Sequence, residues 1–115
     1  MPRFDGKHSD LDSAATLNDC CRDLWNELGM KVPYEALAEI RRIRGLRGGK
    51  QGVGEMKREL KILLAVRDGV PWQHTPVLEL DHIISRADWQ GGNFNAVGNL
   101  RLVGMVSKTP PLKMQ

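Results

Sequence analysis

The chain has 115 residues, 41% of them hydrophobic, which is enough apolar material for one modest domain and too little length for two. Its 17 Lys and Arg residues exceed its 14 Asp and Glu residues, and a formal net charge of +3 is compatible with nucleic acid without requiring it. The adjacent Cys20 and Cys21 argue against a disulfide framework or a zinc knuckle. No apolar run approaches the roughly 18 residues of a membrane span, and no signal-peptide pattern opens the chain. We therefore expect a single domain over residues 1–115 in an intracellular, cytoplasmic protein with no membrane partner.

Three segments within residues 10–69 have the apolar spacing of amphipathic helices. The first would begin near Ser13 and end at Gly29. Pro33 suits the first turn of the second, and the third would run from about Glu55 to Asp68. The residues expected on the buried faces are Leu17, Cys21, Leu24 and Leu28, then Tyr34, Leu37, Ile40 and Ile43, then Met56, Leu60, Leu63 and Leu64. The charged residues expected to point outward from the third helix are Lys57, Arg58, Lys61 and Arg67.

The second helical segment and the residues after it are rich in basic side chains. These residues are Arg41, Arg42, Arg44, Arg47 and Lys50. Arginine pairs well with phosphate oxygens, so the segment could lie along a DNA backbone, or it could simply be the solvated face of a helix. The local density of charge favours DNA contact. Five glycines between Gly45 and Gly54 predict a flexible loop between the second and third helices, without the preceding strand or the following Ser or Thr of a P-loop.

Two short strands are predicted in the last part of the chain. They cover Leu78–Ile84 and Asn99–Val103, and the long loop between them contains Gly91 and Gly92. A carboxylate and an imidazole, Asp81 and His82, are adjacent at the end of the first strand. A site with these groups can hold a divalent cation and activate a water molecule.

The order and separation of four motifs resemble the HNH family of endonucleases, the ββα-metal nucleases. The motifs are Leu63–Gly69, Leu78–Ile84, Gly91-Gly92 and Asn99–Val103. Each is ordinary alone, and the conjunction carries the resemblance, which covers roughly the last half of the chain. It implies an α+β fold in which about three N-terminal helices, in residues 10–69, pack against an HNH-like ββα-metal part in residues 76–115.

The resemblance also implies roles for individual residues. Asp81 would be a ligand of Mg²⁺ or Mn²⁺, and His82 would be the general base. The amide of Asn99 would tie the loop between the strands to the backbone of His82. Arg86 or Arg101 could contact the scissile phosphate of DNA.

The chain departs from the family pattern at two places. Lys108 stands where the family has its second metal ligand, and an ammonium has no lone pair for a cation, so it would touch phosphate instead. Thr109-Pro110-Pro111 would shorten or reshape the closing helix. The cysteine pairs of many members are missing, so we expect no structural zinc, with Trp72 and Trp89 packing in its place.

These observations favour a small HNH-like, metal-dependent DNA endonuclease or nickase. The alternative is a catalytically degenerate HNH-fold module that binds DNA or a protein, as an inhibitor or accessory factor. A purely helical adaptor would leave Asp81, His82 and Asn99 unexplained. By resemblance alone, small free-standing proteins of this kind come from phages or mobile elements.

Overall fold

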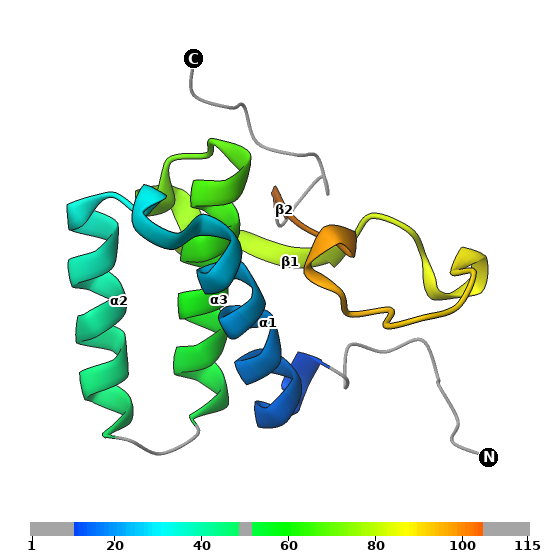
Figure 1. Cartoon of the computed structure of the whole chain (residues 1–115), viewed down its shortest axis with the longest axis horizontal. Coiled ribbons are helices and arrows are strands. Elements are labelled where there is room, and N and C mark those ends of the chain that lie inside the picture. The colour runs from blue at the N-terminus through cyan, green and yellow to red at the C-terminus, as the bar shows by residue number, and fades with distance from the viewer. Residues whose placement is uncertain (1–10, 49–51, 105–115) are drawn as a thin grey trace.

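A computed structural model describes residues 11–48 and 52–104, and within these ranges the fold is mixed α+β (Figure 1). The main elements are helices α1 (Ala14–Leu28), α2 (Tyr34–Arg47) and α3 (Val53–Asp68) and strands β1 (Leu78–His82) and β2 (Leu100–Gly104). Short 3-10 turns, η2 (Gly29–Lys31), η3 (Trp72–Val77), η4 (Arg86–Asp88) and η5 (Val97–Asn99), connect them. The predicted order of three helices followed by a two-stranded hairpin is confirmed. Lys50, Lys108 and the predicted closing segment lie outside the described residues.

Helix α3 is the central element of the fold. It lies between α1 and α2, and both β2 and η3 also pack against it (Figure 1). Its buried residues lie on more than one face, because it has neighbours on several sides: Met56, Glu59, Leu60, Ile62, Leu63, Leu64 and Ala65. In the described ranges, no helix combines the length and the apolar character needed to cross a bilayer.

The ends of α1 follow the predicted capping residues. The hydroxyl of Ser13 accepts a hydrogen bond from the backbone N–H of Thr16, and Gly29 ends the helix with a φ of 53°. The predicted buried face of this helix is confirmed, since Leu17, Cys21, Leu24 and Leu28 are all buried. Leu17 and Leu24 are completely inaccessible to solvent.

Two predictions about α2 and the glycine-rich segment are wrong in detail. The helix continues through Gly45 to Arg47 and α3 already begins at Val53, so the connection is shorter than predicted. A glycine within a helix lowers helix stability by roughly 1 kcal/mol relative to alanine. Burial of Ile40 and Ile43 stabilises α2 and offsets this cost of Gly45. Tyr34 was predicted on the buried face, but it is in the first turn and 76% exposed.

The hairpin presents one face to the helices. Strands β1 and β2 pair antiparallel in continuous register, with Leu80 opposite Leu102 and His82 opposite Leu100. Leu100 and Leu102 belong to the same hydrophobic core as α3, and Leu80 packs against it. Because side chains alternate along a strand, His82 is directed to this helix-facing side and Asp81 to the other.

Candidate active site

Asp81 and His82 occupy the last two positions of β1. The strand is still regularly paired there, so the two side chains leave opposite faces of the hairpin. The sequence predicts that both can reach one phosphate only where the strand bulges or ends. No bulge interrupts the described pairing, but β1 does end at His82. Any shared chemistry therefore has to take place at this end of the strand.

Asp81 forms an ion pair with the residue directly opposite it, Arg101. The guanidinium Nε and Nη2 lie 3.2 and 3.1 Å from Asp81 Oδ2. Both side chains are partly exposed, at 27% for Asp81 and 35% for Arg101. Within the described part of the chain, Asp81 Oδ1 receives no hydrogen bond. The ion pair thus leaves one carboxylate oxygen for a ligand, and it places beside that oxygen the arginine that the sequence assigns to phosphate.

His82 is held by two residues of the loop between the strands. Its Nε2 lies 2.7 Å from Oδ1 of Asn95, and its ring stacks on Phe94 with centroids 4.0 Å apart and planes inclined by 17°. Asn95 is only 6% exposed, and its own backbone carbonyl accepts a hydrogen bond from the thiol of Cys20 on α1 at 3.3 Å. With Asn95 Oδ1 as acceptor, a neutral His82 carries its hydrogen on Nε2 and its lone pair on Nδ1.

Sequence reasoning missed Asn95. The local signal was the repeated asparagine of Asn93-Phe94-Asn95, whose turn is closed by a hydrogen bond from the backbone N–H of Asn95 to Oδ1 of Asn93 at 3.0 Å. Nothing in the sequence distinguishes that turn from a solvated one. The pairing of the strands and the way the loop folds back together bring it against His82.

Asn99 joins the two ends of the loop. Its Oδ1 accepts from the backbone N–H of Ile84 at 2.7 Å, and its Nδ2 donates to the carbonyls of Ile84 at 3.2 Å and Phe94 at 2.9 Å. Its own backbone carbonyl accepts from Ile83 at 2.8 Å. The side chain is buried, with 3% of the residue exposed. Asn99 therefore fixes the backbone just after His82 and the residue that stacks on it, rather than the backbone of His82 itself.

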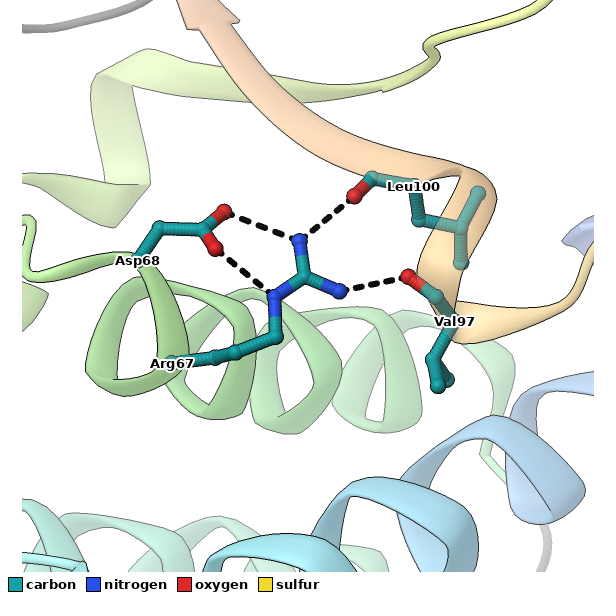
Figure 2. A network of polar contacts seen from close by, with 4 residues as sticks. All are labelled: Arg67, Asp68, Val97 and Leu100. Carbon is teal, nitrogen blue, oxygen red and sulfur yellow. Dashed lines mark hydrogen bonds and ion pairs between the residues drawn. The ribbon is translucent and has the colours of Figure 1, made fainter.

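Arg67, at the end of α3, holds the turn in which Asn99 lies. Its guanidinium donates to the backbone carbonyls of Val97 and Leu100, the latter at 2.6 Å, and to both carboxylate oxygens of Asp68 at 2.7 and 2.9 Å (Figure 2). The prediction that Arg67 points outward is wrong, because its side chain is only 17% exposed. The position that the sequence assigned to solvent is a bridge between the central helix and the hairpin.

The outer part of the loop gathers aromatic and basic side chains around Phe94. The Arg86 guanidinium carbon lies 4.3 Å from the centre of the Phe94 ring, and Trp89 meets the same ring edge-on at 6.0 Å. Trp89 also donates its indole N–H to the carbonyl of Gly92 at 3.1 Å. This loop projects away from the helices (Figure 1). Arg86 thus lies over the same ring that supports His82.

Of the two tryptophans predicted to pack in place of zinc, Trp72 is partly buried against the hydrophobic core and Trp89 lies in this outer loop.

Comparison of the chain with protein-family models, curated proteins and solved structures finds no significant match.

The predicted DNA-binding arginines of α2 lie apart from this site. They are Arg41, Arg42, Arg44 and Arg47. Arg42 donates to both carboxylate oxygens of Glu39 at 2.6 and 2.7 Å, and Arg44 donates to both of Glu59 at 3.1 and 2.6 Å. Glu59 is 2% exposed, so the second pair is part of the fold. Helix α2 lies on the other side of α3 from the loop between β1 and β2, so these arginines are not part of the site at the end of β1 (Figure 1).

The donor set around Asp81 determines which metal it suits. Over residues 11–48 and 52–104, no three His, Cys, Asp or Glu side chains converge on a point where they could hold a metal ion. Mg²⁺ is commonly held by one or two carboxylates, water and the phosphates of its substrate. The single oxygen of Asp81 fits a cation of that kind, and it does not fit a metal that needs a closed cage of protein ligands.

Proposed function

We propose that the chain is a small, HNH-like, metal-dependent DNA endonuclease or nickase. The observation that carries the proposal is the fixed orientation of His82, whose Nε2 is bound by the buried Asn95 and whose ring rests on Phe94. A histidine whose ring is held by an amide oxygen and an aromatic face has a defined position and orientation, which a general base requires. That is a more specific arrangement than a histidine that only fills space in a core.

The reaction would be hydrolysis of a phosphodiester. His82 would take a proton from a water molecule as the water oxygen forms a bond to phosphorus. The bond to the leaving oxygen breaks, and that oxygen would take its proton from solvent water. Asp81, through its Oδ1, would hold Mg²⁺ or Mn²⁺, which when bound neutralises charge on the phosphate. Arg101 would orient Asp81 and then share its charge with the phosphate. Arg86, at the edge of the same loop, would contact the DNA backbone.

Asn95 and Asn99 would act as positioning residues. Asn95 sets the ring of His82, and Asn99 holds the backbone on both sides of the loop that presents Asn95. Neither needs to touch the substrate. Preorganisation of this kind keeps a base within the narrow range of geometry that proton transfer requires.

One observation favours the alternative, a catalytically degenerate module that binds DNA or a protein. Asp81 is neutralised by Arg101, and a cation would have to compete with that arginine for the carboxylate. A protein that had lost its metal chemistry could keep the hairpin and its asparagine contacts for stability alone. The two functions differ in whether DNA is cleaved, so one assay separates them.

The test is incubation of supercoiled plasmid with the full chain in Mg²⁺, in Mn²⁺ or in EDTA. The variant is His82→Ala, and the matched control is His74→Ala, because His74 is an exposed histidine before the opposite end of β1. We expect nicked or linear product that requires metal, persists in His74→Ala and disappears in His82→Ala. DNA binding, measured by gel shift in EDTA, should be similar in all three proteins.

The proposal would be overturned if plasmid stays supercoiled in every metal while the protein is folded, or if His82→Ala cleaves as well as the wild type. Intact plasmid together with a retained gel shift would establish the binding module instead. Loss of both would leave the chain without a role in DNA chemistry.

A further inference from the structure

A pocket of about 400 Å³ lies between α2, α3 and η3, away from the hairpin loop. This volume is within the range of about 300–1,000 Å³ that small-molecule sites occupy. The pocket adjoins the residues that precede β1, whereas His82 ends that strand. It is therefore separate from the candidate active site, and no residue of the proposed nuclease lines it.

The charge of this pocket is positive. Arg58 and Lys61, one turn apart on α3, line it, and neither forms a hydrogen bond or ion pair with any residue in the described ranges. The acidic residue in the lining, Glu39, already has both carboxylate oxygens bound by Arg42 at 2.6 and 2.7 Å. The pocket thus contains two cations without a hydrogen bond or ion pair in the described ranges and one acid, Glu39, whose pKa is lowered by its bonds to Arg42 and, to a smaller degree, by the nearby charge of Arg58.

Lys61 is only partly exposed, and this position is unfavourable for a lone ammonium. Burial, and then the charge of the neighbouring Lys57, lower the pKa of Lys61 below its usual range. An anion bound beside it would reverse both effects, because it would neutralise the ammonium and replace the water that burial has removed. The fold therefore holds a cation at a cost that a bound anion would offset.

The rest of the lining is apolar and aromatic. Ile43 and Ile62 form part of the wall, and Trp72 adds an indole that packs against the core and also lines the pocket. Gln73 adds a side-chain amide, which carries both donors and an acceptor. Flat rings stack on indole, and amides pair with the polar edges of such rings.

We propose that this pocket binds a nucleoside monophosphate, with its phosphate at Arg58 and Lys61 and its base against Trp72. The ligand that this pocket suits is a small anion that carries a flat ring. An aromatic carboxylate has the same two features and is therefore the competing ligand. The phosphate is favoured because two cations can pair with its several oxygens at once. Binding would occur whether or not the chain cleaves DNA.

The experiment is titration of ¹⁵N-labelled full chain with AMP, followed by NMR of the backbone amides and of the tryptophan indole groups. Adenosine, inorganic phosphate and indole-3-acetate serve as separate probes of the ring, the phosphate and the aromatic carboxylate. We expect AMP to shift the signals of Trp72, Gln73 and the Arg58–Lys61 turn. Adenosine and phosphate alone should each bind at least roughly tenfold more weakly, because each lacks one of the two groups that the pocket recognises.

The variants are Lys61→Met and its matched control, Lys57→Met. Lys57 is one turn away on the same helix and pairs with Asp12 instead of lining the pocket. Lys61→Met should weaken AMP binding by roughly tenfold or more, and Lys57→Met by much less, since only the first removes a direct charge contact.

Shifts that map elsewhere, or equal weakening by both variants, would overturn the proposal. Tighter binding of indole-3-acetate than of AMP would overturn the choice of a phosphate. The NMR mapping of AMP uses the wild-type chain, so it tests whether AMP binds in this pocket even if Lys61→Met does not fold.

Discussion

Substitution of Arg67 tests how the hairpin is held to the helices. Arg67→Met keeps most of the aliphatic stem but removes the bonds to the carbonyls of Val97 and Leu100 and to the carboxylate of Asp68. A hydrogen bond to a charged donor contributes about 1.5–3 kcal/mol. The side chain is 17% exposed, so water can replace part of this network and the low end of that range applies to the two carbonyl bonds. We expect the free energy of unfolding to fall by about 3 kcal/mol, or roughly 12 °C in melting temperature.

The assay is urea denaturation followed by circular dichroism, with Arg22→Met as the matched control. Arg22 pairs with Asp19 at 3.0 Å, but both side chains are 59% exposed, and such a pair contributes at most about 1 kcal/mol. Arg67→Lys should be intermediate, because one ammonium cannot reach all three partners in the geometry of the guanidinium fork. A loss in Arg67→Met no larger than that in Arg22→Met would refute the assignment of Arg67 as the bridge between α3 and β2.

Three further changes test other features. Asn99→Asp should lower the free energy of unfolding by about 3 kcal/mol in chemical denaturation, because it removes two buried N–H donors and places a carboxylate oxygen against two carbonyls. A loss below about 0.5 kcal/mol would contradict the role of Asn99 as the loop anchor. Arg44→Met should lower the free energy of unfolding by about 2 kcal/mol, because it leaves the buried Glu59 carboxylate unpaired. The double variant Arg44→Met/Glu59→Leu should recover much of that stability. A double variant no more stable than Arg44→Met would argue against a stabilising role for the ion pair. Burial raises the pKa of Cys20 to about 11 and that of Cys21 to about 12, so above about pH 9 the unfolded thiols lose protons that the folded ones keep. Stability should therefore fall as pH rises from 9 towards 11, by up to about 1.4 kcal/mol per pH unit for each thiol, and a Cys20→Ala/Cys21→Ala variant should show a shallower fall; equal slopes would show that other groups dominate.

The helices and strands were predictable because their signals are local. Apolar residues recur at helical spacing in α1 and α3. The hydroxyl of Ser13 caps the start of α1, and Gly29, which has no side chain, ends it, so both caps can be recognised from the residue type alone. The long glycine-bearing loop between β1 and β2 was also evident, although the end of each strand shifted by one or two residues. The charged residues were harder, because burial of a charge depends on a distant partner. Arg67 was assigned to solvent by its place on the helix, whereas its carbonyl partners lie 30 and 33 residues further along the chain.

In the candidate site, too, the sequence identified the residues whose type suggests chemistry and missed those whose role depends on distant contacts. Asp81 and His82 were identified from the sequence because a carboxylate and an imidazole at a strand end suggest chemistry by their type alone. The ion pair of Asp81 with Arg101 depends on the strand register, which places residues 20 apart directly opposite one another. Asn95 could not be identified, because its contact with His82 depends on how the loop folds back against the strand end.

The contacts of Asn99 have a consequence for how this protein could diversify. One side chain fastens the chain at Ile84 and again at Phe94, so the stretch between these two points begins and ends at fixed positions. Lengthening such a closed stretch costs little conformational entropy, about 0.6 kcal/mol for each doubling. The outer part of this stretch can therefore be extended, by evolution or by design, to change what the tip of the loop touches, while Asn93 and Asn95 keep His82 in its place at the end of the strand.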